Sequence, residues 1–112
     1  TYLISRDELR PGESLRQFVE RQLNELSGQV KGYQSTLKPT LTKIIAGFDE
    51  AIEFAGAFTQ NGQEIHQRQV ALKLPGTQCV LILTLSGFEP FSEAALRNWA
   101  ATISSFKLRP MD

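Results

Sequence analysis

Apolar residues follow two different periods along the chain, and the change of period predicts where strands and helices lie. The opening run TYLIS (1–5) is apolar and β-prone, which is typical of a strand, and the turn-rich connection RDELRPGE (6–13) follows it. Ser14 and Gln17 then have the spacing of a capping box. The apolar residues behind them recur on one helical face: Leu15, Phe18, Val19, Leu23 and Leu26. This pattern predicts a first helix that begins at Ser14 and is closed by Gly28 and Gly32.

The rest of the chain reads as antiparallel strands followed by a second helix. EAIEFAGAFTQ (50–60) and EIHQRQVALKL (64–74) flank Asn61-Gly62, the dipeptide best suited to a type I′ hairpin turn. The turn LPGTQ leads into the apolar strand CVLILTLS (79–86). The stretch YQSTLKPTLTKIIAGF is interrupted by Pro39, which predicts two short edge strands. Pro90 and Ser92 begin a last helix with apolar residues at helical spacing: Leu96, Trp99, Ile103 and Phe106.

The order of these elements is typical of one α+β domain that spans residues 1–112. Strand, helix, several antiparallel strands and a final helix form an antiparallel β-sheet with helices packed on it. A chain of 112 residues is long enough to bury a core of its own.

The two hairpin turns assign side chains to the faces of the sheet, because residues alternate along a strand. Pairing Gln60 with Gln63 places Phe54 opposite Gln69, and the second hairpin then places Gln69 opposite Thr84. One face is an ordinary core that carries Val70, Leu72, Leu81, Leu83 and Leu85. The other face is mixed: Ile52, Phe54, Phe58, Ile65, Val80 and Ile82 surround Gln67, Gln69, Thr84 and Ser86.

Gln22 lies near the centre of the apolar stripe of the first helix, so we expect it to be at least partly buried. One interpretation is that its amide satisfies a nearby backbone group or sits at a wet edge, because buried polar groups are usually just hydrogen-bonded. The other is that it faces a partner. Gln67 and Gln69 have the same two interpretations, a solvated sheet face or a groove that holds an apolar guest and still binds its polar atoms.

Composition excludes several functional classes. The 12 basic and 12 acidic residues cancel and form no basic run, so nucleic acid is not an expected partner. The longest apolar run is far shorter than the roughly 20 residues of a membrane span, and no leader opens the chain, so we expect no membrane insertion. The single cysteine, Cys79, cannot form an internal disulfide, which favours a reducing compartment such as the cytoplasm. We expect Cys79 to be a small buried residue on the core face.

The residues offer little chemistry, so we expect no enzyme, no cofactor and no metal site. His66 is the only histidine and is expected on the face opposite Gln67 and Gln69. Asp7, Glu8 and Glu13 precede the first helix, where negative charge stabilises the helix N-terminus. Trp99 is expected to be a core anchor.

Five segments in order, LISRD, FVERQLNEL, GYQ, NGQEIHQRQV and CVLILTLS, resemble the DcrB-like domain family in its Eag branch. Members of that branch are bacterial chaperones for effectors of the type VI secretion system. The resemblance implies a PsbP-like α/β sandwich and a cytoplasmic homodimer. It also implies a concave surface that holds the N-terminal transmembrane helices of the effector before export. Family members have a further segment before LISRD, so the resemblance also implies that this chain lacks the family's N-terminal strands.

The resemblance marks four residues as positions that line the effector-binding groove. Gln22 and Gln69 match its polar contacts, and Leu3 and Ser5 match groove positions on the first strand. The register argument alone adds Phe54, Phe58, Ile82 and Thr84. Two alternatives stay open: a DcrB- or PsbP-like structural or ligand-binding module of the cell envelope, and an accessory domain of a larger effector.

Overall fold

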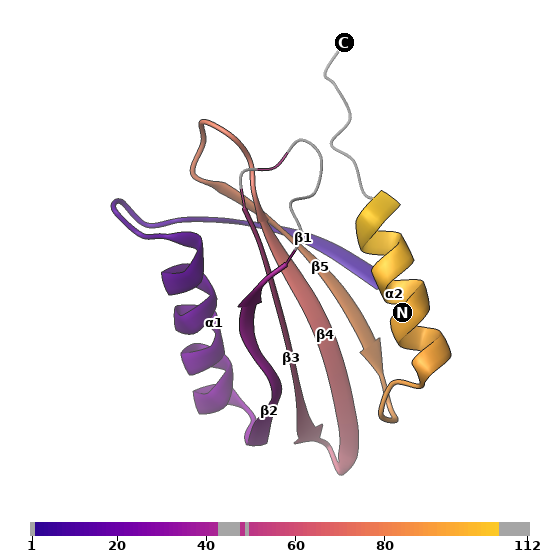
Figure 1. Cartoon of the computed structure of the whole chain (residues 1–112). Helices are drawn as coiled ribbons and strands as arrows, with labels where there is room; N and C mark the ends of the chain where they lie inside the picture. The colour runs from indigo at the N-terminus through magenta and orange to yellow at the C-terminus, as the bar shows by residue number, and fades with distance from the viewer. Residues whose placement is uncertain (1, 43–47, 49, 106–112) are drawn as a thin grey trace.

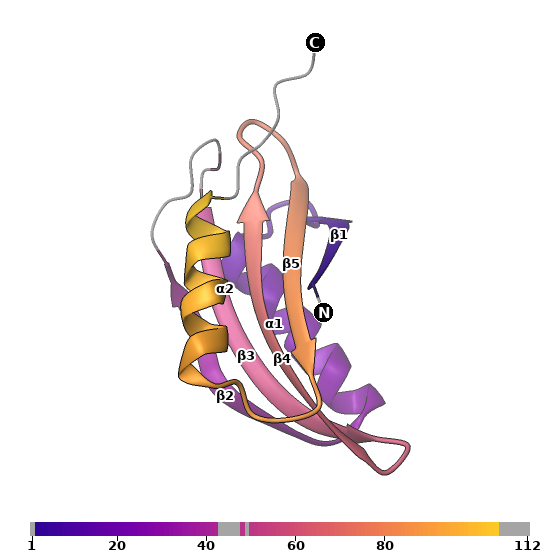
Figure 2. The same ribbon diagram turned by 90° about the vertical axis from the view of Figure 1, so that its right-hand side faces the viewer.

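The structure is a computed structural model that describes residues 2–42, 48 and 50–105, except the side chain of Lys31. Five strands form one antiparallel sheet in the order β1-β5-β4-β3-β2. The strands are β1 (Tyr2–Glu8), β2 (Lys31–Leu41), β3 (Glu50–Gln60), β4 (Gln63–Lys73) and β5 (Cys79–Gly87), and the helices are α1 (Leu15–Gln29) and α2 (Glu93–Ser105). Figure 1 shows the two helices on opposite sides of the sheet, and Figure 2 shows the same arrangement turned by 90°. The predicted α+β class is confirmed.

Both predicted hairpin registers are confirmed. Gln60 pairs with Gln63, Phe54 with Gln69, and Gln69 with Thr84. Asn61 and Gly62 have positive φ angles of 53° and 76°, as a type I′ turn requires. Side chains therefore alternate between the two faces as the sequence predicts.

The capping box of α1 is confirmed. Ser14 Oγ accepts the backbone N–H of Gln17 at 3.1 Å, and Gln17 Oε1 accepts the backbone N–H of Ser14 at 2.9 Å. Two donors that a helix start leaves without partners are thus satisfied. At the start of α2, Ser92 Oγ accepts the N–H of Ala95 at 3.1 Å.

Each face of the sheet carries one helix. On the first face, called face 1 here, α1 buries Phe18 and Val19 against Ile52, Phe54 and their neighbours. On the opposite face, face 2, α2 buries Trp99 and Ile103 against Val70, Leu72, Leu81, Leu83 and Leu85. Trp99 is 2 % exposed, which confirms its role as a core anchor. The mixed face is therefore divided, because part of it is an ordinary core beneath α1.

Several local predictions are wrong. β1 extends through Glu8, so Asp7 and Glu8 belong to a strand and not to the connection before α1. The segment around Pro39 is one edge strand with register shifts, because an edge strand accommodates a proline and bulges without breaking. Gly28 lies inside α1, which ends at Gln29. Residues 43–47 and Phe106 lie outside the described residues.

Cys79 is exposed, not buried. It has the face parity of the core residues Leu81 and Leu83, but it is the first residue of β5 and adjoins the turn at Gly76. The alternation of side chains along β5 places Cys79 on the core face, as predicted. Its side chain is exposed because it lies at the end of the strand. Within the described ranges, neither α1 nor α2 combines the length and the apolar character that a membrane-crossing helix needs.

Tyr33 of β2 packs across Gly56 of β3 and stacks on Phe58 with ring centroids 6.4 Å apart. A methyl group at Gly56 would overlap the hydroxyl and ring of Tyr33, whose Cε2 lies 2.7 Å from that position. The aromatic ring covers the place that a side chain would otherwise fill, a known way to stabilise a glycine in a sheet.

We expect Gly56→Ala to lower the free energy of unfolding by about 1–3 kcal/mol, the usual cost of overpacking. Gly28→Ala is the matched control, because nothing lies within 4 Å of its added methyl. In a helix, alanine is favoured over glycine by roughly 0.5–1 kcal/mol, so this control is expected to be stabilised. Urea unfolding measures both. A Gly56→Ala protein as stable as the wild type would contradict the packing of Tyr33 on Gly56.

Candidate functional site

A groove of about 360 Å³ lies on face 1 between α1 and the sheet. We call it the glutamine groove and define it by its ten lining residues. α1 contributes Phe18, Gln22, Leu23, Glu25, Leu26 and Gln29, and the sheet contributes Phe54, Gln67, Gln69 and Ile82. The groove therefore combines aromatic and aliphatic side chains with four carboxamides, a composition suited to holding an apolar ligand in a fixed orientation.

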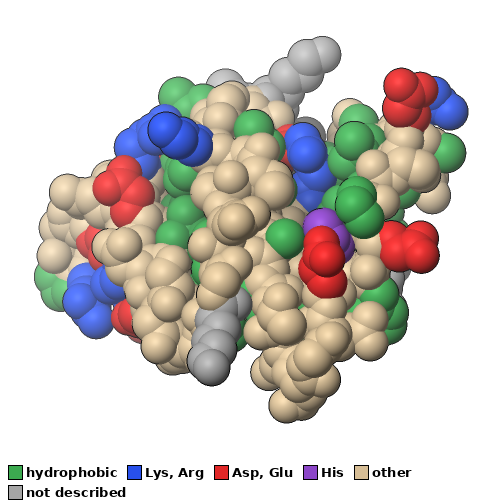
Figure 3. Space-filling model, turned by 90° about the horizontal axis from the view of Figure 1, so that it is seen from below, with side chains coloured by type: hydrophobic (Ala, Val, Ile, Leu, Met, Phe, Trp, Pro, Cys, Tyr) green, Lys and Arg blue, Asp and Glu red, His purple; other side chains and the backbone are tan. Residues whose placement is uncertain are grey.

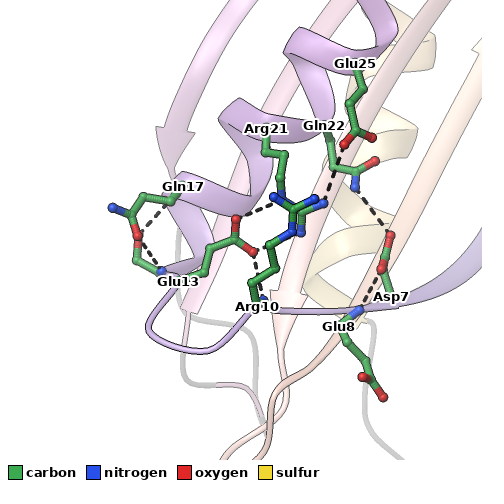
Figure 4. A network of polar contacts seen from close by, with 9 residues as sticks. Asp7, Glu8, Arg10, Glu13, Gln17, Arg21, Gln22 and Glu25 are labelled. Atoms are coloured by element: carbon green, nitrogen blue, oxygen red, sulfur yellow. Dashed lines mark hydrogen bonds and ion pairs between the residues drawn. The ribbon is translucent and has the colours of Figure 1, made fainter.

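The helix wall is positioned by the face of α1 that looks toward the sheet. Phe18 is buried beneath the helix, whereas Leu23 and Leu26, one and two turns further along, are only partly covered. Gln22 is partly buried, and its Nε2 donates to Oδ2 of Asp7 in β1 at 3.4 Å. Figure 4 shows this contact, which connects α1 to the edge strand of the sheet. The partner of Gln22 is a side chain and not a backbone group, and the contact is exposed, as the wet-edge interpretation expects.

Two glutamines in the floor of the groove form a hydrogen-bonded chain with Thr84, which lies behind the lining. Thr84 Oγ1 donates to Gln69 Oε1 at 3.4 Å, and Gln69 Nε2 donates to Gln67 Oε1 at 3.4 Å. Each bond is long, but together they connect the two amides of β4 to the hydroxyl of Thr84 on β5. The Nε2 group of Gln67 is the donor at the end of this chain.

A charged network fixes the first turns of α1 beside the groove. Arg21 Nε and Glu13 Oε2 lie 2.9 Å apart, and Arg21 NH1 lies 3.7 Å from Glu25 Oε1. The guanidinium of Arg21 also lies 5.3 Å above the ring of Phe18. Hydrogen bonding from Arg21, helped by the backbone N–H of Arg10, lowers the pKa of Glu13 from 4.5 to about 2. The hydrogen bond with Glu13 in turn raises the pKa of Arg21.

The structure brings four of the eight predicted site residues together in the groove: Gln22, Gln69, Phe54 and Ile82. Thr84 is 8 % exposed and lies behind the lining, where it bonds Gln69. Leu3 and Ser5 are exposed on β1 next to the groove, paired with Thr84 and Ile82. Phe58 is not part of the lining and packs beneath Tyr33.

Gln67 lines the groove although the sequence marks it only as a polar residue of the mixed face. Phe18, Leu23 and Leu26 were assigned to the helix stripe without a role in the groove, although the stripe itself was the signal. Asp7 was assigned to the helix dipole. No pattern in the sequence indicated that it would contact Gln22, because this contact depends on where β1 lies beside α1.

His66 lies on face 2, as predicted. Its Nε2 is 2.6 Å from Glu64 Oε1, and its ring contacts Phe91 edge-on at 6.4 Å. Figure 3, which views the molecule from below, shows this histidine beside an acidic side chain, with charges of both signs scattered over the visible surface. Among the described residues, no three His, Cys, Asp or Glu side chains gather as a metal ion would require.

Comparisons with known proteins place the chain in a family and a fold. A family model described as DcrB matches residues 1–105. Among curated protein sequences, none matches. The structure is similar to that of PA94 from Pseudomonas aeruginosa, a protein of unknown function described as a candidate regulator. Their TM-score is 0.71 at 24 % identity, over 98 % of this chain and 73 % of PA94.

A second similar structure is LpqN of Mycobacterium tuberculosis, described as involved in cell envelope biogenesis. The TM-score is 0.59 at 18 % identity, over 94 % of this chain and 58 % of LpqN. Both likenesses show the fold, a five-stranded antiparallel sheet with two helices packed on it.

We expect Glu13→Gln to make stability less dependent on pH. The lowered pKa means that the Glu13–Arg21 pair stabilises the fold fully above about pH 4.5 and that this stabilisation is lost as the pH falls toward 2. The variant should therefore be less stable than the wild type at neutral pH, and the difference should shrink between pH 4.5 and 2.

Urea unfolding at several pH values measures this difference. The control is Glu25→Gln, because the Glu25 side chain is 50 % exposed and lies 3.7 Å from Arg21. We expect it to change stability less, since exposed ion pairs contribute little. A difference between Glu13→Gln and wild type that stays constant with pH would contradict the assignment.

Proposed function

The chain belongs to the DcrB family, and from this premise we propose that it is a binding module that holds an apolar helical segment of a partner in the glutamine groove. The observation that carries the proposal is that Gln22, from a helix, and Gln69, from a strand, line the same groove. Leu23, Phe54 and Ile82 lie between and around them. The proposed role is binding and not catalysis.

The shape of face 1 supports a helical guest. α1 contacts β2, β3 and β4, whereas the described part of β1 is exposed along its whole length. Leu3 is 62 % exposed there, on the same face as Gln69. A helix about 10–12 Å wide would lie beside α1 and cover the strands that α1 leaves open.

The chemistry of the groove supports a guest that is apolar but not entirely so. Helices recognise one another in lipid through close packing and side-chain hydrogen bonds, each worth about 1 kcal/mol or less. Carboxamides among apolar side chains offer the same two kinds of contact, because an amide donates and accepts. Such a groove would hold a membrane helix in water without burying it irreversibly.

Two biological settings fit this role. In the first, the guest is the N-terminal transmembrane region of a type VI secretion effector, and the chain is a cytoplasmic homodimeric chaperone. This setting draws on the resemblance to Eag chaperones, and the groove is what favours it. In the second, the chain is a structural or ligand-binding module of the cell envelope. The comparisons support the second setting more directly, because LpqN is described as involved in cell envelope biogenesis.

Two experiments separate the settings. Fractionating cells that express the full-length protein at its natural level shows whether it lies in the cytosol or in the envelope. Co-purification with the N-terminal region of an effector encoded nearby tests the chaperone role itself. An envelope location together with no effector binding would leave the second setting.

We expect Gln22→Ala and Gln69→Ala each to weaken binding of an apolar helical peptide by about three- to tenfold. Gln22→Ala removes an amide that can bond the guest, and Gln69→Ala removes the amide that orients Gln67. The controls are Asn24→Ala, exposed on the outer side of α1, and Gln63→Ala, exposed at the start of β4. Fluorescence anisotropy with a lysine-flanked leucine-rich peptide measures the affinity. Circular dichroism confirms that each variant is folded. Equal binding by the groove variants and the controls would contradict the proposal.

A further inference from the structure

Asp7 determines which end of the Gln22 amide a guest would meet. Gln22 Nε2 donates to Asp7 Oδ2 at 3.4 Å. An ionised carboxylate can only accept, so the amide must turn its NH₂ group toward Asp7. Its carbonyl oxygen then lies on the other side of the planar group, and no described residue donates to it.

Asp7 is itself held in place. Its Oδ1 accepts the backbone N–H of Glu8 at 2.8 Å, and its strand pairs with β5 at Val80. One carboxylate oxygen of Asp7 therefore accepts from the backbone of β1 and the other from the Gln22 side chain of α1, as Figure 4 shows. The charge of Asp7 is the smallest of the causes that raise the pKa of Arg21, so positive charge lies near Asp7.

Gln69 differs from Gln22 in this respect. It uses both ends of its amide within the sheet, accepting from Thr84 and donating to Gln67. Gln22 uses only its donor end within the described residues. The helix wall of the groove therefore presents a free acceptor.

We propose that Asp7 is a positioning residue that turns the Gln22 carbonyl toward the guest, so that the groove selects an apolar helix carrying a hydroxyl side chain that can donate to it. The proposal rests on the proposed function, binding of an apolar helical segment in the glutamine groove. The donor must come from a side chain, because the backbone N–H groups of a helix are already bonded internally. Serine and threonine supply such a donor and are common where membrane helices contact one another.

Three lysine-flanked helical peptides that differ at one central residue test this inference. The central residue is serine, O-methylserine or valine. O-methylserine keeps the oxygen as an acceptor but cannot donate. We expect the wild-type protein to bind the serine peptide about three- to tenfold more tightly than the O-methylserine peptide, the range of one hydrogen bond.

Asp7→Ala is expected to bring the ratio of the two affinities close to one while it leaves binding of the valine peptide within about twofold. A merely structural role for Asp7 would weaken all three peptides together. Asp7→Asn, which keeps the size of the side chain but lets the Gln22 amide turn over, is a second variant if Asp7→Ala does not fold. Gln22→Met removes the acceptor directly and should abolish the serine preference.

If the wild type binds the valine peptide but does not prefer serine over O-methylserine, the inference is overturned and the proposed function stands. If the preference persists in Asp7→Ala and Asp7→Asn, the role of Asp7 is overturned. If no peptide binds, the proposed function fails and the inference fails with it.

Discussion

One helix is too narrow to cover one face of this sheet, and that mismatch of widths creates the groove. A helix with its side chains is about 10–12 Å across, whereas neighbouring strands lie about 4.8 Å apart, so five strands extend well beyond it. α1 packs over β2, β3 and β4, and the described residues of β1 stay exposed. The glutamine groove lies along this boundary, where covered sheet gives way to uncovered sheet.

The polar residues of face 1 lie where the cover of α1 over the sheet ends. Beneath α1 the sheet is apolar, with Ile52 and Phe54 almost fully buried, and at the side of the helix it carries the partly buried Gln67 and Gln69. Partly covered amides need partners, and they find them in Asp7, Thr84 and each other. No buried side-chain polar atom of the described residues lacks a partner. The groove is therefore compatible with a stable domain and still has an acceptor and a donor to offer a guest.

Alternation and turn chemistry were enough to predict most of the fold. Asn61-Gly62 fixed the register that places Phe54, Gln69 and Thr84 on one face, and the capping box fixed the start of α1. The sequence could not show which helix covers which face, because that depends on how the connections run in space. It also could not show that Cys79 is exposed or that Asp7 bonds Gln22, since both follow from where elements end and meet. Alternation along each strand predicts which face a side chain is on, but not how deeply the packed helix buries it. Only half of the predicted site residues therefore line the groove.

Site-specific photo-crosslinking shows whether an apolar helix binds face 1 beside α1. A benzophenone amino acid would replace Leu23 in the groove or, as a control, the exposed Asn98 on α2 across the sheet. We expect a leucine-rich helical peptide to be crosslinked from position 23 and not from position 98. Crosslinking from position 98 alone, or equally from both positions, would contradict this expectation.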